Sequence, residues 1–116
     1  MNENAKRWIE ALRSGRYGQT RDRLKSLGEF CCLGVACEIS GLADWGDDDS
    51  YLGAVHTLPE RVCDWLGVKC WDPTIYIDGY TLSLSFMNDR RWLGFDEIAD
   101  LIETHAGEIF LQKGGS

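Results

Sequence analysis

Residues 30–40 constrain the fold of this chain most strongly, because they form its densest apolar segment and have to be buried. The segment reads FCCLGVACEIS, and its small residues permit close packing against a neighbouring element. Four residues would share one helical face: Leu33, Ala36, Cys37 and Ser40. Gly41 follows directly and is typical of the residue that ends a helix. We therefore expect a buried helix here, and the periodicity leaves open that a short strand leads into it.

Three further segments have apolar residues at helical spacing, and each predicts an amphipathic helix: residues 5–14, 57–66 and 95–104. Glycines follow these segments and are expected to end the helices: Gly15, Gly67 and Gly107. Thr57 and Glu60 have the spacing of a capping box at the start of the second segment, with Pro59 in its first turn. Residues 16–29 are polar and basic, and they predict a loop followed by a short turn or strand.

A β-hairpin is expected over residues 73–86, because two short runs of strand-forming residues flank Asp78 and Gly79. Asp-Gly is the usual pair for a two-residue type I′ turn, which needs positive φ at both positions. After the turn, apolar residues alternate with polar ones, which predicts a strand with one buried face: Leu82, Leu84 and Phe86. Residues 109–111 are a candidate for one extra short edge strand.

Together these elements predict an α+β fold, a compact single domain of about three helices with a β-hairpin and an optional extra short strand. A length of 116 residues fits one domain. We place this domain at residues 1–112, followed by a flexible tail at residues 113–116. Helices and strands do not alternate as β-α-β units, which argues against a Rossmann-like sheet. No stretch approaches the roughly 20 apolar residues of a membrane span, and the polar residues 1–4 predict that there is no signal peptide.

The charge of the chain is divided unevenly between its N-terminal quarter and the rest. Residues 1–27 carry seven basic and three acidic side chains, a net charge of +4. Residues 28–116 carry five basic and sixteen acidic side chains, a net charge of −11, and the whole chain has a net charge of −7. Nucleic acid and membrane phosphates repel an acidic surface, whereas basic protein surfaces attract it. We therefore expect neither duplex nucleic acid nor a membrane as a partner. The alternative is a charged face that only keeps the protein soluble.

No catalytic constellation is visible in the sequence. Cys31 and Cys32 lie near the start of the expected buried helix, where the helix dipole can lower the pKa of a thiol, but no histidine is placed beside them. The five cysteines lack the paired spacing of a zinc site. There is no Walker loop, dinucleotide-binding glycine motif or G-x-S-x-G elbow. We therefore expect a protein that binds without catalysis, with no cofactor or metal, and with cysteines that pack in the core.

Three segments occur in a fixed order: ALRSG at residues 11–15 with Tyr17, CCLG at residues 31–34, and ND at residues 88–89 followed by FDEIADLIE at residues 95–103. In this order they resemble a family of small bacteriophage and prophage proteins of unknown function, over most of the chain. The resemblance implies an accessory protein in the cytoplasm of a bacterial host cell. It implies no activity and no catalytic residues.

The first candidate binding surface is an acidic loop made of Asp44, Trp45, Asp47, Asp48 and Asp49. We expect it to dock on a basic surface of a bacterial host protein and to inhibit or redirect that protein. A defence-system component is the favoured class of partner. A loop tryptophan either fills the edge of a core or marks a contact surface, and the sequence leaves both roles open for Trp45.

The alternative is that the chain sequesters a small phosphorylated nucleotide. In that case arginines would hold the phosphates and a loop tryptophan would stack on the base: Arg13, Arg16, Arg21 and Arg23, with Trp71 or Trp92. A third hypothesis is a thiol or metal-binding protein that uses Cys31 and Cys32.

Overall fold

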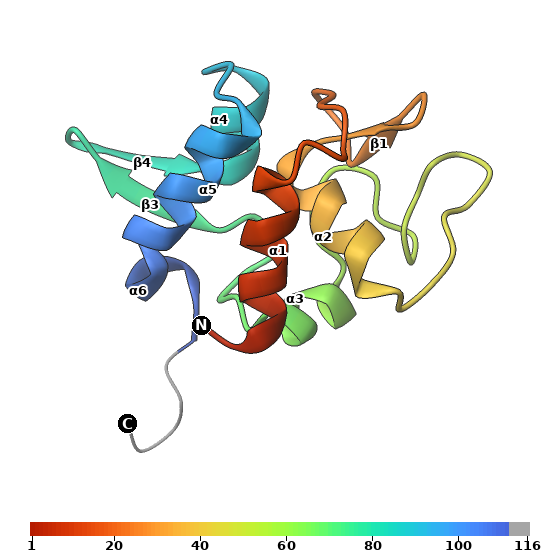
Figure 1. The fold of residues 1–116 in the computed structure, drawn as a ribbon, viewed down its shortest axis with the longest axis horizontal. Helices are drawn as coiled ribbons and strands as arrows, with labels where there is room; N and C mark the ends of the chain where they lie inside the picture. The colour runs from red at the N-terminus through yellow and green to blue at the C-terminus, as the bar shows by residue number, and fades with distance from the viewer. Residues whose placement is uncertain (112–116) are drawn as a thin grey trace.

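The helix α1 (Glu3–Arg13) lies at the centre of the fold, where it packs along α5 (Phe95–Thr104) (Figure 1). The computed structural model describes residues 1–111. Both helices are amphipathic as expected, because each buries one apolar stripe. Asn2 caps α1 by accepting a hydrogen bond from the backbone N–H of Ala5 at 2.8 Å. Gly15 lies just beyond the helix, as predicted, with a φ of 76°.

The expected buried helix is confirmed as α2 (Cys32–Ser40), and the short strand β2 (Glu29–Phe30) leads into it. The first six residues of α2 are all buried, because α1, α3 and α4 pack around it. Gly34 has to be glycine, since a Cβ atom there would lie 1.9 Å from the carbonyl oxygen of Leu24. Gly41 ends the helix in the left-handed region, with a φ of 62°.

A small hairpin precedes α2 and pairs β1 (Lys25–Ser26) with β2 in antiparallel register. Its turn residues, Leu27 and Gly28, have φ values of 52° and 78°, as a two-residue type I′ turn requires. Leucine is uncommon in this backbone region, and Leu27 is 95% exposed. The short turn or strand expected within residues 16–29 is present as the strand β1, but its pairing into a hairpin was not predicted.

The expected β-hairpin is present as β3 (Thr74–Ile77) and β4 (Tyr80–Ser83). Asp78 and Gly79 form its turn with φ values of 52° and 85°, which confirms the predicted type of turn. The two strands are antiparallel, and Ile77 pairs with Tyr80 across the turn.

The helix α4 (Leu84–Asp89) replaces the expected end of the second strand, so the predicted strand positions Leu84 and Phe86 are wrong. Ser83 caps this helix, because its Oγ accepts from the backbone N–H of Phe86 at 3.1 Å. A serine cap satisfies an N–H group that has no partner within the first turn of a helix. The local cap therefore outweighs the two-residue alternation of the side chains.

The helix α3 (Glu60–Leu66) begins three residues later than expected. Pro59 is its N-cap residue and is extended, so the predicted capping box of Thr57 and Glu60 is not formed. The ring of Pro59 disfavours helical backbone at the preceding residue, Leu58. The N–H of Leu58 instead donates to the carbonyl oxygen of Trp71 at 2.9 Å.

The C-terminal part differs from the prediction in the role of Gly107. The helix α5 ends at Thr104 with His105 as its cap, and Gly107 lies inside the short helix α6 (Ala106–Ile109). The expected edge strand at residues 109–111 is reduced to a single bridge between Phe110 and Val68. The tail predicted at residues 113–116 lies outside the described residues.

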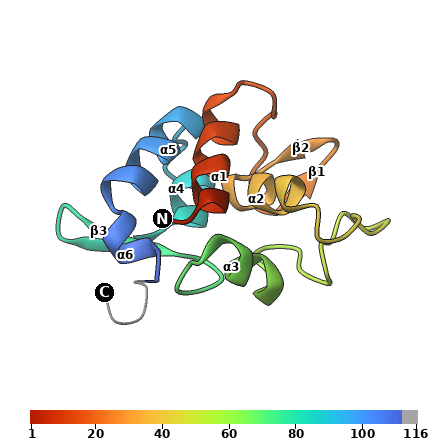
Figure 2. The ribbon, with the colours of Figure 1, turned by 60° about the horizontal axis from the view of Figure 1, so that its bottom comes forward.

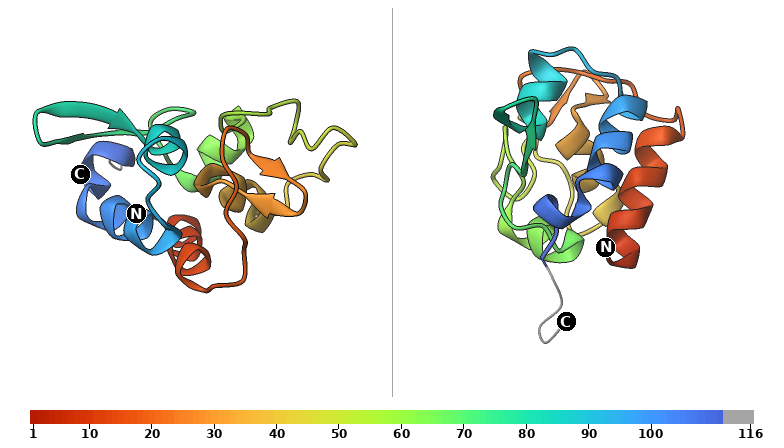
Figure 3. Two further views of the ribbon diagram at one scale, coloured as in Figure 1. Left: turned by 90° about the horizontal axis from the view of Figure 1, so that it is seen from above. Right: turned by 90° about the vertical axis from the view of Figure 1, so that its left-hand side faces the viewer.

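The expected α+β class is confirmed, with six helices and two small antiparallel sheets within residues 1–111, where about three helices were expected. The buried apolar side chains form one core, and α3 lies below α1 and α2 (Figure 2). The β3–β4 hairpin and the long loop between α2 and α3 project at opposite ends of the molecule (Figure 3). No helix within the described residues is both long and apolar enough to cross a membrane.

Candidate functional site

The acidic loop, defined here as residues 44–50, lies in the long connection between α2 and α3 and is closed by backbone hydrogen bonds. The N–H of Gly46 donates to the carbonyl oxygen of Ser50 at 2.8 Å, and the N–H of Asp49 donates to that of Gly46 at 2.9 Å. Bridges also join Tyr51 to residues 45 and 54. The acidic loop is therefore a defined turn on a rigid base.

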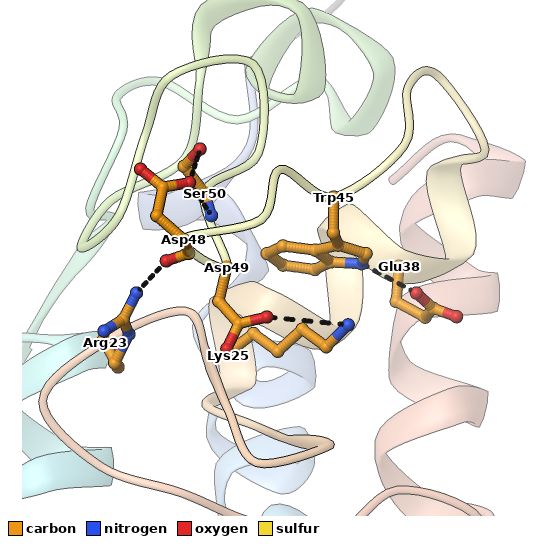
Figure 4. A network of polar contacts seen from close by, with 7 residues as sticks. All are labelled: Arg23, Lys25, Glu38, Trp45, Asp48, Asp49 and Ser50. Atoms are coloured by element: carbon orange, nitrogen blue, oxygen red, sulfur yellow. Dashed lines mark hydrogen bonds and ion pairs between the residues drawn. The ribbon is translucent and has the colours of Figure 1, made fainter.

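Trp45 points inward from the acidic loop and fills the edge of the core. The centroid of its ring lies 4.9 Å from that of Tyr51 and 5.8 Å from that of Phe30. Its Nε1 donates to the Glu38 carboxylate at 2.8 Å, and Nζ of Lys25 lies 5.1 Å from its ring centroid (Figure 4). Of the two roles left open for Trp45, the structure shows the first, because the ring anchors the loop.

The basic N-terminal segment neutralises part of the acidic loop. Nζ of Lys25 lies 3.9 Å from the Asp49 carboxylate, and Nη2 of Arg23 donates to the backbone carbonyl of Asp48 at 2.6 Å (Figure 4). The Asp48 carboxylate accepts from Oγ of Ser50 at 2.6 Å, and this hydrogen bond is the main cause that lowers the pKa of Asp48. Three aspartates of the loop remain exposed: Asp44, Asp47 and Asp48.

The four arginines predicted to hold phosphates lie in different surroundings. Arg13 donates to Asp100 at 2.6 Å and to Glu103 at 2.9 Å. These hydrogen bonds, that to Glu103 first, raise the pKa of Arg13 further above its ordinary value. Arg16 lines a groove along α1 together with Arg7. Since Arg23 is bound to the acidic loop, these three do not form one phosphate site.

Arg21 and Trp92 are brought together by the structure. The guanidinium carbon of Arg21 lies 3.8 Å from the centroid of the Trp92 ring, and we name this pair the Arg21–Trp92 stack. Trp92 is 68% exposed although Arg21 covers one face of its ring. Trp71, the other predicted stacking residue, is 65% exposed and lies in a separate groove beside α3.

Asn88 was not among the predicted site residues, yet its buried amide connects the two parts of the stack. Its Oδ1 accepts from the N–H of Cys32 at 3.2 Å and from Nε2 of Gln19 at 2.8 Å. Its Nδ2 donates to the carbonyl oxygen of Thr20 at 2.9 Å, and Nε2 of Gln19 also donates to that of Leu93 at 2.8 Å. The turn after α4, which carries Trp92, is thereby joined to the segment that carries Arg21. The Asn-Asp pair at 88–89 indicates a turn but gives no signal that its amide is buried.

Cys31 and Cys32 are buried thiols whose environment opposes ionisation. Burial raises the pKa of Cys31 to about 12 and also raises that of Cys32. Sγ of Cys31 accepts from the N–H of Gly34 at 3.4 Å and so caps α2, but burial outweighs this contact. Within residues 1–111, no three histidine, cysteine, aspartate or glutamate side chains are arranged to hold a metal ion. Cys31 and Cys32 therefore pack in the core, and their environment does not activate them as nucleophiles.

Comparison with known proteins identifies a family and no activity. Neither the curated proteins nor the solved structures contain a match to the chain. Residues 1–106 match a family described as a domain of unknown function, DUF8296. The matched range includes the acidic loop, the Arg21–Trp92 stack and Asn88. Because this match covers most of the chain, the protein belongs to the DUF8296 family.

Proposed function

We propose that this protein is a non-enzymatic, phage-encoded accessory protein that binds a basic surface of a bacterial host protein through its acidic loop. Binding would inhibit or redirect the host protein in the cytoplasm of the host cell, and a defence-system component is the favoured class of partner. The phage origin is inferred from the three ordered segments that resemble phage and prophage proteins.

The observation that carries this proposal is an acidic loop that is held in one conformation before any partner arrives. Trp45 fixes the loop to the core, and Arg23 and Lys25 hold it at Asp48 and Asp49. A loop that is already ordered loses less conformational entropy when it docks than a mobile one does. The ion pair between Lys25 and Asp49 therefore favours binding, because it orders the loop before a partner arrives.

Among the three exposed aspartates of the loop, Asp44 and Asp47 have carboxylates that accept no hydrogen bond within residues 1–111, whereas the Asp48 carboxylate accepts from Ser50. Asp44 and Asp47 also form no ion pair within residues 1–111. Complementary charges across an interface increase the association rate and disfavour acidic partners. The chemistry of the loop therefore fits a basic protein surface.

Affinity capture of the tagged chain from a bacterial host lysate, read by mass spectrometry at moderate salt, tests the proposal. We expect one stoichiometric host protein, and its affinity should fall with increasing salt. The double variant Asp44→Asn, Asp47→Asn should lower this affinity by about 2- to 30-fold, because an exposed ion pair contributes about 0.2–1 kcal/mol.

The matched control is the double variant Asp64→Asn, Asp96→Asn, which removes the same charge from the exposed surfaces of α3 and α5. Its affinity for the captured protein should equal that of the unmodified chain. An equal loss of affinity in both double variants, or capture that does not respond to salt, would contradict docking through the acidic loop.

A further inference from the structure

We propose that the Arg21–Trp92 stack is a binding site for a nucleotide. The base would stack on the open face of the Trp92 ring, and a phosphate would lie on Arg21 and the arginines beside it. This site uses different residues from the proposed docking of the acidic loop and does not depend on it.

The open aromatic face is the first argument for a ligand. Arg21 lies 3.8 Å from the ring centroid and covers one face of the indole, yet Trp92 is still 68% exposed. A nucleobase stacks readily on an exposed indole, because every base has a π-face. The guanidinium below the ring adds a cation to this stacking platform.

Backbone strain at the stack is the second argument. Trp92 has a φ of 58°, in the left-handed region. Bulky residues rarely adopt the left-handed region, and an exposed cation–π contact stabilises a fold by less than such strain costs. Strained residues that persist are concentrated at binding sites. The strain at a largely exposed tryptophan therefore points to a ligand.

The stack is held rigidly from both sides. The carbonyl oxygen of Asp22 lies 2.8 Å from Nδ1 of His56, and the carboxylate of Asp22 lies 3.4 Å from Nη2 of Arg90. On the other side, Gln19 binds the carbonyl oxygen of Leu93, and Asn88 joins both segments from the core. The two parts of the site are therefore in place before a ligand binds.

Cations gather at this position although the chain as a whole is acidic. Arg90 reaches Asp22, and Arg91 precedes Trp92 in the sequence. Nε of Arg21 is buried without a hydrogen-bond partner within residues 1–111. Arg21 and Arg91 form no ion pair in the same range. Guanidinium groups bind phosphate oxygens in a bidentate manner, which gives the site an anion-binding half next to its stacking half.

The net charge of −7 favours a free nucleotide over a nucleic acid strand as the source of this chemistry. A long polyanion meets the repulsion of the whole acidic surface, whereas one nucleotide meets only the local arginines.

Titration of the ¹⁵N-labelled full chain with adenosine monophosphate tests the proposal, because the five tryptophans give separate indole N–H signals. The Trp92→Phe variant assigns the signal of Trp92. We expect a saturable shift of this signal with adenosine monophosphate, and weaker binding of adenosine alone and of inorganic phosphate alone. Each of the variants Trp92→Leu and Arg21→Gln should weaken binding by about 5- to 150-fold.

Trp71→Leu is the matched control, because it removes an equally exposed tryptophan at a different groove and should leave the affinity unchanged. Arg21→Lys keeps the charge but loses the planar group, so it should bind more weakly than the unmodified chain and more tightly than Arg21→Gln. Thermal unfolding shows whether each variant is folded. If Trp92→Leu is unfolded, the comparison of Arg21→Lys with Arg21→Gln still tests the site.

A ten-residue oligothymidylate distinguishes the two sources of the nucleotide. Weaker binding of this strand than of adenosine monophosphate would support a free nucleotide, and tighter, strongly salt-dependent binding would support an unpaired strand on the same stack. The proposal is overturned if millimolar nucleotide leaves the Trp92 signal unchanged. It is also overturned if binding persists in both Trp92→Leu and Arg21→Gln. The double variant Asp44→Asn, Asp47→Asn should bind the nucleotide as tightly as the unmodified chain does. Failure of the nucleotide proposal can therefore be distinguished from failure of the proposed docking through the acidic loop.

Discussion

The substitution Asn88→Ala should both destabilise the fold and release the Arg21–Trp92 stack. In the native protein the amide of Asn88 is fully buried and joins four groups from three segments of the chain. Two of these groups belong to the backbone, the N–H of Cys32 and the carbonyl of Thr20. The other two are the side chains of Gln19 and Asp89.

The size of the effect follows from the two backbone groups that alanine leaves without a partner. The side chains of Gln19 and Asp89 can turn toward water, whereas the N–H of Cys32 and the carbonyl of Thr20 are fixed in place. An unsatisfied buried polar group costs about 1–3 kcal/mol, so the pair gives about 2–6 kcal/mol. This is a large part of the free energy of unfolding of a small domain, about 5–15 kcal/mol. At about 4 °C per kcal/mol, the melting temperature should fall by about 8–24 °C.

Urea unfolding followed by circular dichroism measures the loss, and the indole N–H signal of Trp92 reports on the stack. The matched control is Asn4→Ala, because Asn4 is only half-buried and its amide donates one hydrogen bond, to the carbonyl oxygen of Trp65 at 2.9 Å. We expect this control to lose at most about 1 kcal/mol.

A loss from Asn88→Ala no greater than the loss from Asn4→Ala would refute the reasoning. It would mean that the orphaned backbone groups find new partners, and that Asn88 is not a structural junction. A loss of the predicted size with an unchanged Trp92 signal would refute only the second part, that Asn88 positions the stack.

Three further substitutions and one chemical treatment test other parts of the structure. Gly34→Ala should lower the free energy of unfolding by about 1–3 kcal/mol or more, because its Cβ would meet the carbonyl oxygen of Leu24 at 1.9 Å. Gly107→Ala, with no atom within 4 Å of its Cβ, should be neutral or stabilising in the same urea assay. Among the described thiols, Ellman's reagent should modify the exposed Cys70 first, since burial raises the pKa of Cys31 to about 12 and that of Cys63 to about 11. Glu108→Gln should destabilise the fold above the ordinary glutamate pKa of 4.5, because hydrogen bonds from His105 and then from the N–H of Tyr76 lower the pKa of Glu108. Because the pKa of Glu108 is lower in the folded state, the stability that this carboxylate contributes is lost as the pH falls. The free energies of unfolding of the two proteins should therefore converge in acid. A difference that stays constant with pH would contradict this assignment.

The parts of the fold that the sequence predicts correctly depend on neighbours along the chain. The helix α1 and the helix α5 follow from apolar residues at helical spacing, and the turn at Asp78 and Gly79 follows from the backbone preferences of those two residues. The prediction fails where two local signals compete. After Ser83 the alternation of side chains favours a strand, whereas the serine cap favours a helix, and the cap decides the outcome.

The arrangement of the candidate sites was less predictable, because it depends on contacts between distant parts of the chain. Arg21 and Trp92 were both predicted as ligand-binding residues, but their contact depends on Asn88 and Gln19, which lie 69 positions apart. Likewise, the sequence shows a basic segment and an acidic loop, but it does not indicate that Arg23 and Lys25 contact the loop. Periodicity and turn chemistry carry no information about such pairings.

Part of the uneven charge of the chain is used in contacts within the molecule. The basic N-terminal segment has four cations bound to acidic residues or to the acidic loop: Lys6, Arg13, Arg23 and Lys25. Lys6 pairs with Glu3 within α1, whereas the other three cations tie the N-terminal segment to α5 and to the acidic loop. Two places present charge in a fixed arrangement: the exposed carboxylates of Asp44 and Asp47 on the ordered acidic loop, and the guanidinium of Arg21 on the Trp92 ring. Each place has its own set of variants, Asp44→Asn with Asp47→Asn for the acidic loop and Arg21→Gln for the stack, so a partner that binds at one place should respond to that set and not to the other.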